Sequence, residues 1–165
     1  MKTILFAFLL GLSFAAPAQT SIDEMKKLTP LVGQWKGTAS YRMGPGEPQI
    51  VQQHETIEFR LNGAVLQIEG TGTVGDRTVH HALAMVNFDS NQKKFFFRSY
   101  LSDGKMADAQ FQVTAEGVYT WGFDYPGRKM RYVITIAGNQ WKETGEYSPD
   151  GTQWTRFIEM NLTRQ

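Results

Sequence analysis

The feature that most constrains this chain is a series of nine turn signals spread over residues 44–151. Asn-Gly and Asp-Gly pairs are strong hairpin formers, and Gly and Pro mark the remaining turns. Nine such turns join ten strands, each antiparallel to its neighbour. The signals are Gly44-Pro45-Gly46, Asn62-Gly63, Gly75-Asp76, Ser90-Asn91, Asp103-Gly104, Glu116-Gly117, Pro126-Gly127, Gly138-Asn139 and Asp150-Gly151.

Between the turns the sequence alternates with a period of two, which indicates half-buried strands. In residues 35–43 the odd positions are apolar or glycine and the even positions are polar or charged. A long meander exposes two sheet edges unless it closes on itself. We therefore expect an all-β fold, a ten-stranded antiparallel up-and-down meander barrel. An open two-sheet sandwich is the alternative.

A short helix is expected before the first strand, over residues 21–28. Ser21 and Glu24 have the spacing of a capping box, in which each side chain satisfies a backbone N–H at the start of a helix. Met25 and Leu28 then lie on one face, and Pro30 ends the helix. Two turns of helix are unstable alone, so we expect this helix to close one end of the barrel.

Trp35 and Arg164 are predicted to meet at that closed end. In a ten-stranded closed meander the first and last strands are antiparallel neighbours, so the start of one lies beside the end of the other. A guanidinium over an indole face contributes ~0.5–2 kcal/mol. We interpret both residues as structural barrel closure and not as ligand contacts.

Five short motifs follow one another in a characteristic order. They are Met25-Lys26-Lys27-Leu28, Leu31-Val32-Gly33-x-Trp35-x-Gly37, Ile57-Glu58-Phe59-Arg60-Leu61-Asn62-Gly63, Asn87-Phe88-Asp89 and Phe157-Ile158-Glu159-Met160-Asn161-Leu162-Thr163-Arg164. With these motifs the chain resembles lipocalin-like (calycin) proteins, and more specifically a bacterial lipocalin-like family catalogued as a domain of unknown function (domain of unknown function 1579). The resemblance covers roughly residues 21–165 and implies a barrel. It implies no established activity and brings no catalytic residues.

The N-terminal residues have the pattern of a cleaved signal peptide. Lys2 precedes an apolar run that is too short to span a membrane, and Ala16-Pro17-Ala18 offers small residues where a signal peptidase reads. We expect residues 1–18 to be removed, leaving a single domain over residues 19–165 in a secreted or periplasmic protein. An uncleaved N-terminal anchor is the alternative.

The amino-acid composition of the chain argues against several classes of partner and site. The 17 basic and 16 acidic residues nearly balance and form no long run of one sign, so we expect no nucleic-acid partner. No other segment is apolar enough for a spanning helix, so no membrane insertion is expected. The chain has no cysteine, which excludes disulfides, zinc–thiolate sites and thiol nucleophiles. We expect a monomer or a weak homo-oligomer.

The last four strands can be paired by centring them on their turns. Pairing on residues 126–127, 138–139 and 150–151 places twelve residues on one face of the sheet, and we expect this face to point inward. The three rows are Trp121, Tyr132, Gly145 and Arg156; Tyr119, Ile134, Glu143 and Ile158; and Phe123, Met130, Tyr147 and Trp154.

This predicted wall is aromatic and carries one cation and one anion. We predict that Arg156 anchors the polar end of a ligand, because a guanidinium among aromatic rings suits a carboxylate or phosphate. A buried Arg156–Glu143 ion pair is the alternative, since buried charges are usually paired. The candidate ligand-binding residues are Arg156, Tyr132, Trp121, Trp154, Glu143, Tyr119, Tyr147 and Met130.

The sequence offers little support for a catalytic site or a metal site. His80 and His81 are adjacent on a strand and point to opposite faces, and His54 could approach one of them only across an intervening strand, so we expect no metal site. Similar barrels that bind haem use a late-strand histidine, and none follows His81 here. No serine has the context of a nucleophile elbow. We expect no cofactor.

Three functions remain open. The first is an exported barrel that binds a small amphipathic or hydrophobic molecule. The second is an envelope structural or interaction protein with a filled barrel. The third is an isomerase or hydrolase that uses an internal carboxylate such as Glu143. A cavity of at least ~300 Å³ separates the first reading from the second.

Overall fold

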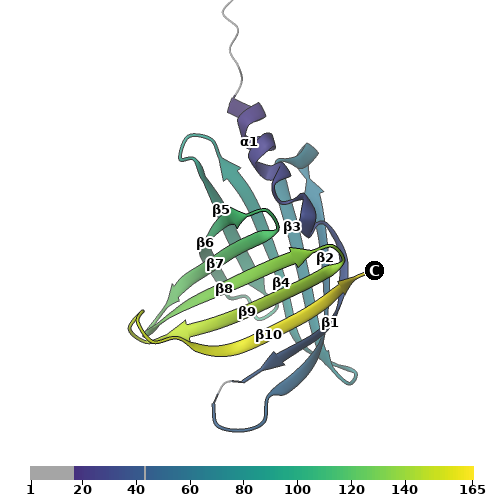
Figure 1. Cartoon of the computed structure of the whole chain (residues 1–165), viewed down its shortest axis with the longest axis vertical. Coiled ribbons are helices and arrows are strands. Elements are labelled where there is room, and N and C mark those ends of the chain that lie inside the picture. The colour runs from purple at the N-terminus through teal and green to yellow at the C-terminus, as the bar shows by residue number, and fades with distance from the viewer. Residues whose placement is uncertain (1–16, 43) are drawn as a thin grey trace, which may run out of the picture.

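The computed structural model describes residues 17–42 and 44–165 and shows a closed barrel of ten antiparallel strands (Figure 1). Each strand pairs with the next along the chain, and β1 closes the barrel against β10, as the turn signals predict. The elements are α1 Pro17–Lys26, η1 Thr29–Leu31, β1 Gly33–Tyr41, β2 Gln49–Arg60, η2 Leu61–Gly63, β3 Val65–Val74, β4 Arg77–Asp89, β5 Lys94–Leu101, β6 Met106–Ala115, β7 Val118–Tyr125, β8 Arg128–Ala137, β9 Gln140–Ser148 and β10 Thr155–Arg164.

Helix α1 lies at one end of the barrel, next to η2 and β4 (Figure 1). Met25 and Leu28 are fully buried and, with Leu31 of η1, belong to the hydrophobic core of the barrel. Because the helix begins at Pro17, Ser21 lies within it, so the expectation that the helix starts at Ser21 is wrong. Packing against the barrel, and not the capping box, accounts for the stability of this short segment.

The closed end is held by Trp35 and Arg164, which face each other across β1 and β10. The Arg164 guanidinium lies 4.0 Å from the centre of the Trp35 ring system. Arg164 also donates hydrogen bonds to the carbonyls of Val32 and Pro30, and the Trp35 indole donates to the Leu31 carbonyl at 2.8 Å. The predicted stack is therefore present, and it ties the last strand to the segment that leads into the first.

Gly33 is required at this point for two reasons. Its φ of +135° lies in a region that L side chains rarely adopt. A Cβ atom there would also lie 2.6 Å from Nη1 of Arg164. In the Gly33-Gln34-Trp35 motif, Trp35 therefore supplies the ring on which Arg164 stacks, and Gly33 leaves space for the Arg164 guanidinium.

The pairing predicted for the last strand is wrong by two residues. Strands β7, β8 and β9 have the predicted register, with Trp121 opposite Tyr132 and Tyr132 opposite Gly145. Opposite Gly145, however, stands Ile158 and not Arg156. The link between β9 and β10 covers residues 149–154 instead of a two-residue turn, and a β-bulge follows Arg156. Such a bulge reverses which side chains face inward.

The predicted signal peptide, residues 1–18, falls almost entirely outside the described residues and stays a prediction. Among the residues that are described, no helix is both long and apolar enough to cross a membrane.

Candidate functional site

The barrel contains a cavity of about 840 Å³. It lies beyond the core layer formed by Trp35, Leu31 and Met25, and it reaches the turns β5–β6 and β7–β8, where Lys105, Tyr125 and Arg128 line it. In an up-and-down barrel alternate turns lie at opposite ends, so this mouth is at the end away from α1. The cavity thus has one closed end and one open end.

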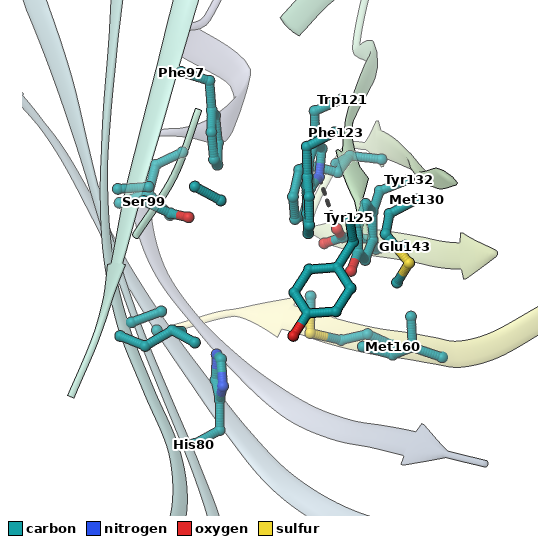
Figure 2. A pocket seen from close by; sticks show the side chains of 18 of the residues that line it. His80, Phe97, Ser99, Trp121, Phe123, Tyr125, Met130, Tyr132, Glu143 and Met160 are labelled. Atoms are coloured by element: carbon teal, nitrogen blue, oxygen red, sulfur yellow. Dashed lines mark hydrogen bonds between the residues drawn. The ribbon is translucent and has the colours of Figure 1, made fainter. Parts of the chain in front are cut away.

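One side of the cavity is an aromatic wall formed by Phe97, Trp121, Phe123 and Tyr132 (Figure 2). The rings of Trp121 and Tyr132 stack at 3.7 Å between centroids and 3° between planes. Phe97 stacks on Trp121 at 5.0 Å. This wall joins β5, β7 and β8 and presents flat apolar faces, a surface suited to a planar or hydrophobic molecule.

The opposite part of the lining consists of small residues on β3 and β4. Gly70, Ala82 and Ala84 line the cavity and leave it wide. A Cβ atom at Gly70 would lie 2.6 Å from both carboxyl oxygens of Glu55, so the glycine is what makes room for that carboxyl group. The cavity is therefore wide because these positions on β3 and β4 carry glycine or alanine.

Glu143 lies in the cavity lining between two indoles. It is 6% exposed, and its Oε1 and Oε2 accept hydrogen bonds from the Nε1 atoms of Trp121 at 3.0 Å and Trp141 at 3.2 Å. Figure 2 shows Glu143 beside Trp121 and Tyr132. Burial, together with the charge of Glu55, raises the pKa of Glu143 to about 8.

Glu55 of β2 is the second buried carboxyl group in the lining. It is 7% exposed, and its Oε1 accepts a hydrogen bond from Nε2 of Gln53 at 2.7 Å. Burial raises the pKa of Glu55 to about 7. We call Glu55 and Glu143 the carboxyl pair, because the charge of Glu55 acts on Glu143 and the charges of both act on Tyr41.

Two phenols lie within the field of the carboxyl pair. Burial and the charges of Glu143 and Glu55 raise the pKa of Tyr41 to about 12. The pKa of Tyr132 is raised above its ordinary value by burial, by Glu143 and by Tyr41. Both phenols are therefore protonated at any accessible pH and offer an O–H group to the cavity, whose lining contains them.

Four of the eight residues predicted to bind ligand line the cavity: Trp121, Met130, Tyr132 and Glu143. Tyr119 is fully buried and serves the closed end, where its hydroxyl donates to the Lys27 carbonyl at 3.1 Å. The remaining three are absent from the lining: Tyr147, Trp154 and Arg156.

The predicted inward position of Arg156 is wrong. Its side chain is 54% exposed and lies 3.4 Å from Oε1 of Glu146, a residue on the outward parity of β9. The alternative ion pair with Glu143 is not formed either, since Glu143 is bonded to the two indoles. The bulge in β10 is the physical reason, because it places Ile158 where Arg156 was expected.

Trp154 and Tyr147 also lie outside the cavity lining, although Tyr147 keeps its predicted place opposite Met130. Trp154 precedes β10, and the guanidinium of Arg131 lies 3.9 Å from its ring centroid on the outside of the barrel. Tyr147 packs against Phe157 at 6.1 Å and carries the Arg128 guanidinium at 5.4 Å. Cations and aromatic rings therefore pair around the mouth and outer wall rather than within the cavity.

The prediction missed Glu55, Gln53 and Tyr41 as site residues. A signal for Glu55 exists in the sequence: centring the first hairpin on Pro45 sets Glu55 opposite Trp35, and this is the observed pairing. The inward side of Trp35 then fixes the inward side of Glu55 and Gln53. Centring the next hairpin on Asn62-Gly63 likewise sets Glu55 opposite Gly70 and Gln53 opposite Gly72, which is also the observed pairing.

The histidines divide as their positions predict. His80 lines the cavity, whereas His81 lies on the outer face, where its ring is 2.9 Å from Glu69. His54 and His81 both pair with Thr71 and so stand on either side of one strand. Burial and the neighbouring His81 lower the pKa of His80. Within residues 17–42 and 44–165, no group of three His, Asp or Glu side chains could hold a metal ion.

The comparison that decides the family is a family model described as a protein of unknown function (DUF1579), which matches residues 20–164. The chain belongs to this family. No curated protein matches the chain.

Two solved structures show the same fold as this DUF1579 protein. Rv2717c from M. tuberculosis has a TM-score of 0.63 at 13% identity, with 86% of this chain and 96% of that chain covered. The S-type phycobiliprotein lyase CPES from Guillardia theta has a TM-score of 0.60 at 9% identity, with 90% and 95% covered. At these identities the likeness is one of fold, a lipocalin-like barrel.

Proposed function

We propose that this protein is an exported barrel that binds one small hydrophobic or amphipathic molecule. The observation that carries the proposal is the cavity of about 840 Å³ with its aromatic wall and a few convergent polar side chains. Ligand sites in proteins are typically ~300–1,000 Å³, mostly apolar, with few polar groups that fix orientation. The signal-peptide pattern of residues 1–18 supports export.

The size of the cavity argues against a filled structural barrel. Protein interiors are close-packed, with few voids larger than a water molecule. A void of this size would forfeit many contacts unless a molecule occupied it. A structural neighbour is named a phycobiliprotein lyase, so at least one barrel of this shape acts on another molecule.

An isomerase or hydrolase that uses an internal carboxylate is the second candidate. The raised pKa of Glu143, about 8, is the observation that favours it, because a general base works best with a pKa near the working pH. Each oxygen of Glu143 already accepts a hydrogen bond from an indole N–H group, which stabilises the carboxylate against taking up a proton and favours a binding role over proton transfer.

Native mass spectrometry of protein purified from the exported fraction without detergent tests the proposal. We expect a complex with one small molecule per chain, which collisional activation converts to the bare protein. Release of a chemically altered molecule after incubation would favour the enzyme instead. A chain that stays bare after incubation with a lipophilic cell extract would contradict the binding function.

A further inference from the structure

The polar part of the cavity contains three side chains that accept hydrogen bonds. Glu55 and Glu143 both line it, and Gln53 lies between Glu55 and the mouth-ward residues of β2. Gln53 is 4% exposed, lines the cavity, and its Oε1 has no hydrogen-bond partner among the described residues. A buried polar atom without a partner costs about 1–3 kcal/mol. No side chain among the described residues donates a hydrogen bond to this oxygen.

Glu55 is a second acceptor in this part of the cavity. Its Oε1 accepts a hydrogen bond from Nε2 of Gln53, and its carboxyl group lies in the cavity lining. Gly70 leaves this carboxyl group uncovered by any side chain of β3. A carboxyl group on a residue that is only 7% exposed thus lines the cavity, and its charge acts on a second buried carboxyl group, Glu143 of β9.

Basic residues do not supply the missing donor. Of the cavity-lining residues only Lys105 and Arg128 are permanently cationic, and both belong to the turns at the mouth. Lys105 pairs with Asp103, and the Arg128 guanidinium lies over the Tyr147 ring. His80 also lines the cavity, with a pKa lowered by burial. The carboxyl pair therefore faces the cavity without a cation of its own.

We propose that the polar end of the cavity recognises a primary ammonium group, held by Glu55, Glu143 and the side-chain oxygen of Gln53. This inference rests on the proposed binding function and names its ligand class, a cationic amphiphile. An ammonium group has three N–H donors, which match the three acceptor side chains. Its apolar body would lie against the aromatic wall of Phe97, Trp121, Phe123 and Tyr132.

The same arrangement disfavours an acidic ligand. At pH 7.5 Glu55 is largely ionised, because its pKa is about 7. A carboxylate beside it brings like charges together where the dielectric is low, and no cation compensates it. A neutral alcohol can donate one hydrogen bond but gains no charge interaction. The expected order of affinity is therefore amine, then alcohol, then acid.

Three pyrene probes with the same apolar body test this order. 1-Pyrenemethylamine, 1-pyrenemethanol and 1-pyreneacetic acid are each titrated at pH 7.5 by equilibrium dialysis against the full mature chain. We expect the amine to bind at least about tenfold more tightly than the alcohol, the lower end of what a hydrogen bond to a charged group contributes. The acid should bind more weakly than the alcohol.

Glu55→Gln identifies the group responsible. It keeps the shape of the side chain but removes one negative charge, so it should reduce the preference for the amine about tenfold and leave the alcohol within about twofold. Glu69→Gln is the matched control, since Glu69 lies on the outer face of β3. Circular dichroism establishes that each variant is folded, and Gln53→Leu provides a second inward variant that should also lower the preference.

The outcomes separate the two claims. If the alcohol binds and the amine binds no more tightly, the ammonium site is wrong while the binding function stands. If Glu69→Gln lowers the amine preference as much as Glu55→Gln, the recognition is not in the cavity. If none of the three probes binds, the binding function itself is contradicted, and the ammonium site with it.

Discussion

The guanidinium of Arg164 lies 4.0 Å from the ring centroid of Trp35, and through this contact the last strand of the barrel closes on the first. Trp35 is fully buried and also meets Trp141 edge-on at 5.6 Å. The two residues stand 129 positions apart in the chain numbering, and neither lines the cavity. They serve the closure that gives the cavity its closed end.

Trp35→Ala should lower the free energy of unfolding by about 3–5 kcal/mol, the usual cost of removing a large buried aromatic side chain. Trp154→Ala is the matched control, since that indole is partly exposed on the outer wall, and should cost much less. Urea denaturation measures both. A loss below about 1 kcal/mol for Trp35→Ala would mean that the closed end does not depend on this stack.

The carboxyl pair should make the protein less stable as the pH rises from 5 to 8. The pKa values of Glu55 and Glu143 are raised in the folded state, to about 7 and about 8, so between the ordinary value of 4.5 and these values the folded chain binds more protons than the unfolded one. The free energy of unfolding therefore falls as the pH rises. For each group the fall is at most about 1.4 kcal/mol per pH unit, over the range between its pKa in the unfolded chain and its pKa in the folded chain.

The slope can be assigned by comparing variants. Tyr41 and Tyr132 also face the pair, but their raised pKa values keep them neutral over this range. His80 lines the same cavity with a lowered pKa and contributes the opposite slope at the acidic end. Subtracting the Glu55→Gln profile from that of the wild type removes its contribution. An identical slope in Glu55→Gln would show that Glu55 is ionised in the folded state.

Arg156→Gln should leave the affinity for 1-pyrenemethanol and for 1-pyreneacetic acid within about twofold of the wild type. The reason is that Arg156 lies on the outer wall beside Glu146 and does not line the cavity. Equilibrium dialysis measures both. A selective loss of the acid would place Arg156 at the ligand after all and would require a different pairing of β10.

On the proposal that the chain is exported, the mature protein should begin at Gln19 or close to it. Ala16-Pro17-Ala18 supplies the small residues that signal peptidase reads, and there is no cysteine that could carry a lipid. Intact-mass measurement of material from the exported fraction gives the answer directly. A mass that still includes residues 1–18 would indicate an N-terminal anchor instead.

The sequence predicts the barrel well because its strongest signals are local. Each two-residue turn sets the pairing of the strands on either side, and the order of the turns then fixes the meander. The same logic gives Trp121, Tyr132 and Glu143 their inward positions. The contact of Trp35 with Arg164 follows from closure alone.

The site is predicted less well because it depends on features that local signals do not fix. The longer link of residues 149–154 and the bulge after Arg156 shift the last strand, which exchanges a predicted inward cation for Ile158. Centring on Asn62-Gly63 sets Glu55 opposite Gly70, but the way the Glu55 carboxyl group fills the space over this glycine depends on packing and not on the turn. The sequence predicts one inward cation and one inward anion, whereas Arg156 lies outside the cavity and two buried carboxyl groups, Glu55 and Glu143, line it.

The central claim is that the barrel interior is a binding site, and filling it tests that claim most directly. Ala82→Trp places a large side chain in the cavity lining, whereas Val133→Trp places the same side chain on the exposed outer face of β8. Equilibrium dialysis with 1-pyrenemethanol compares the two with the wild type. We predict one probe per chain for the wild type and Val133→Trp, and at least about a tenfold loss of affinity for a folded Ala82→Trp. Equal binding by all three proteins would contradict the account, because it would place the probe outside the barrel.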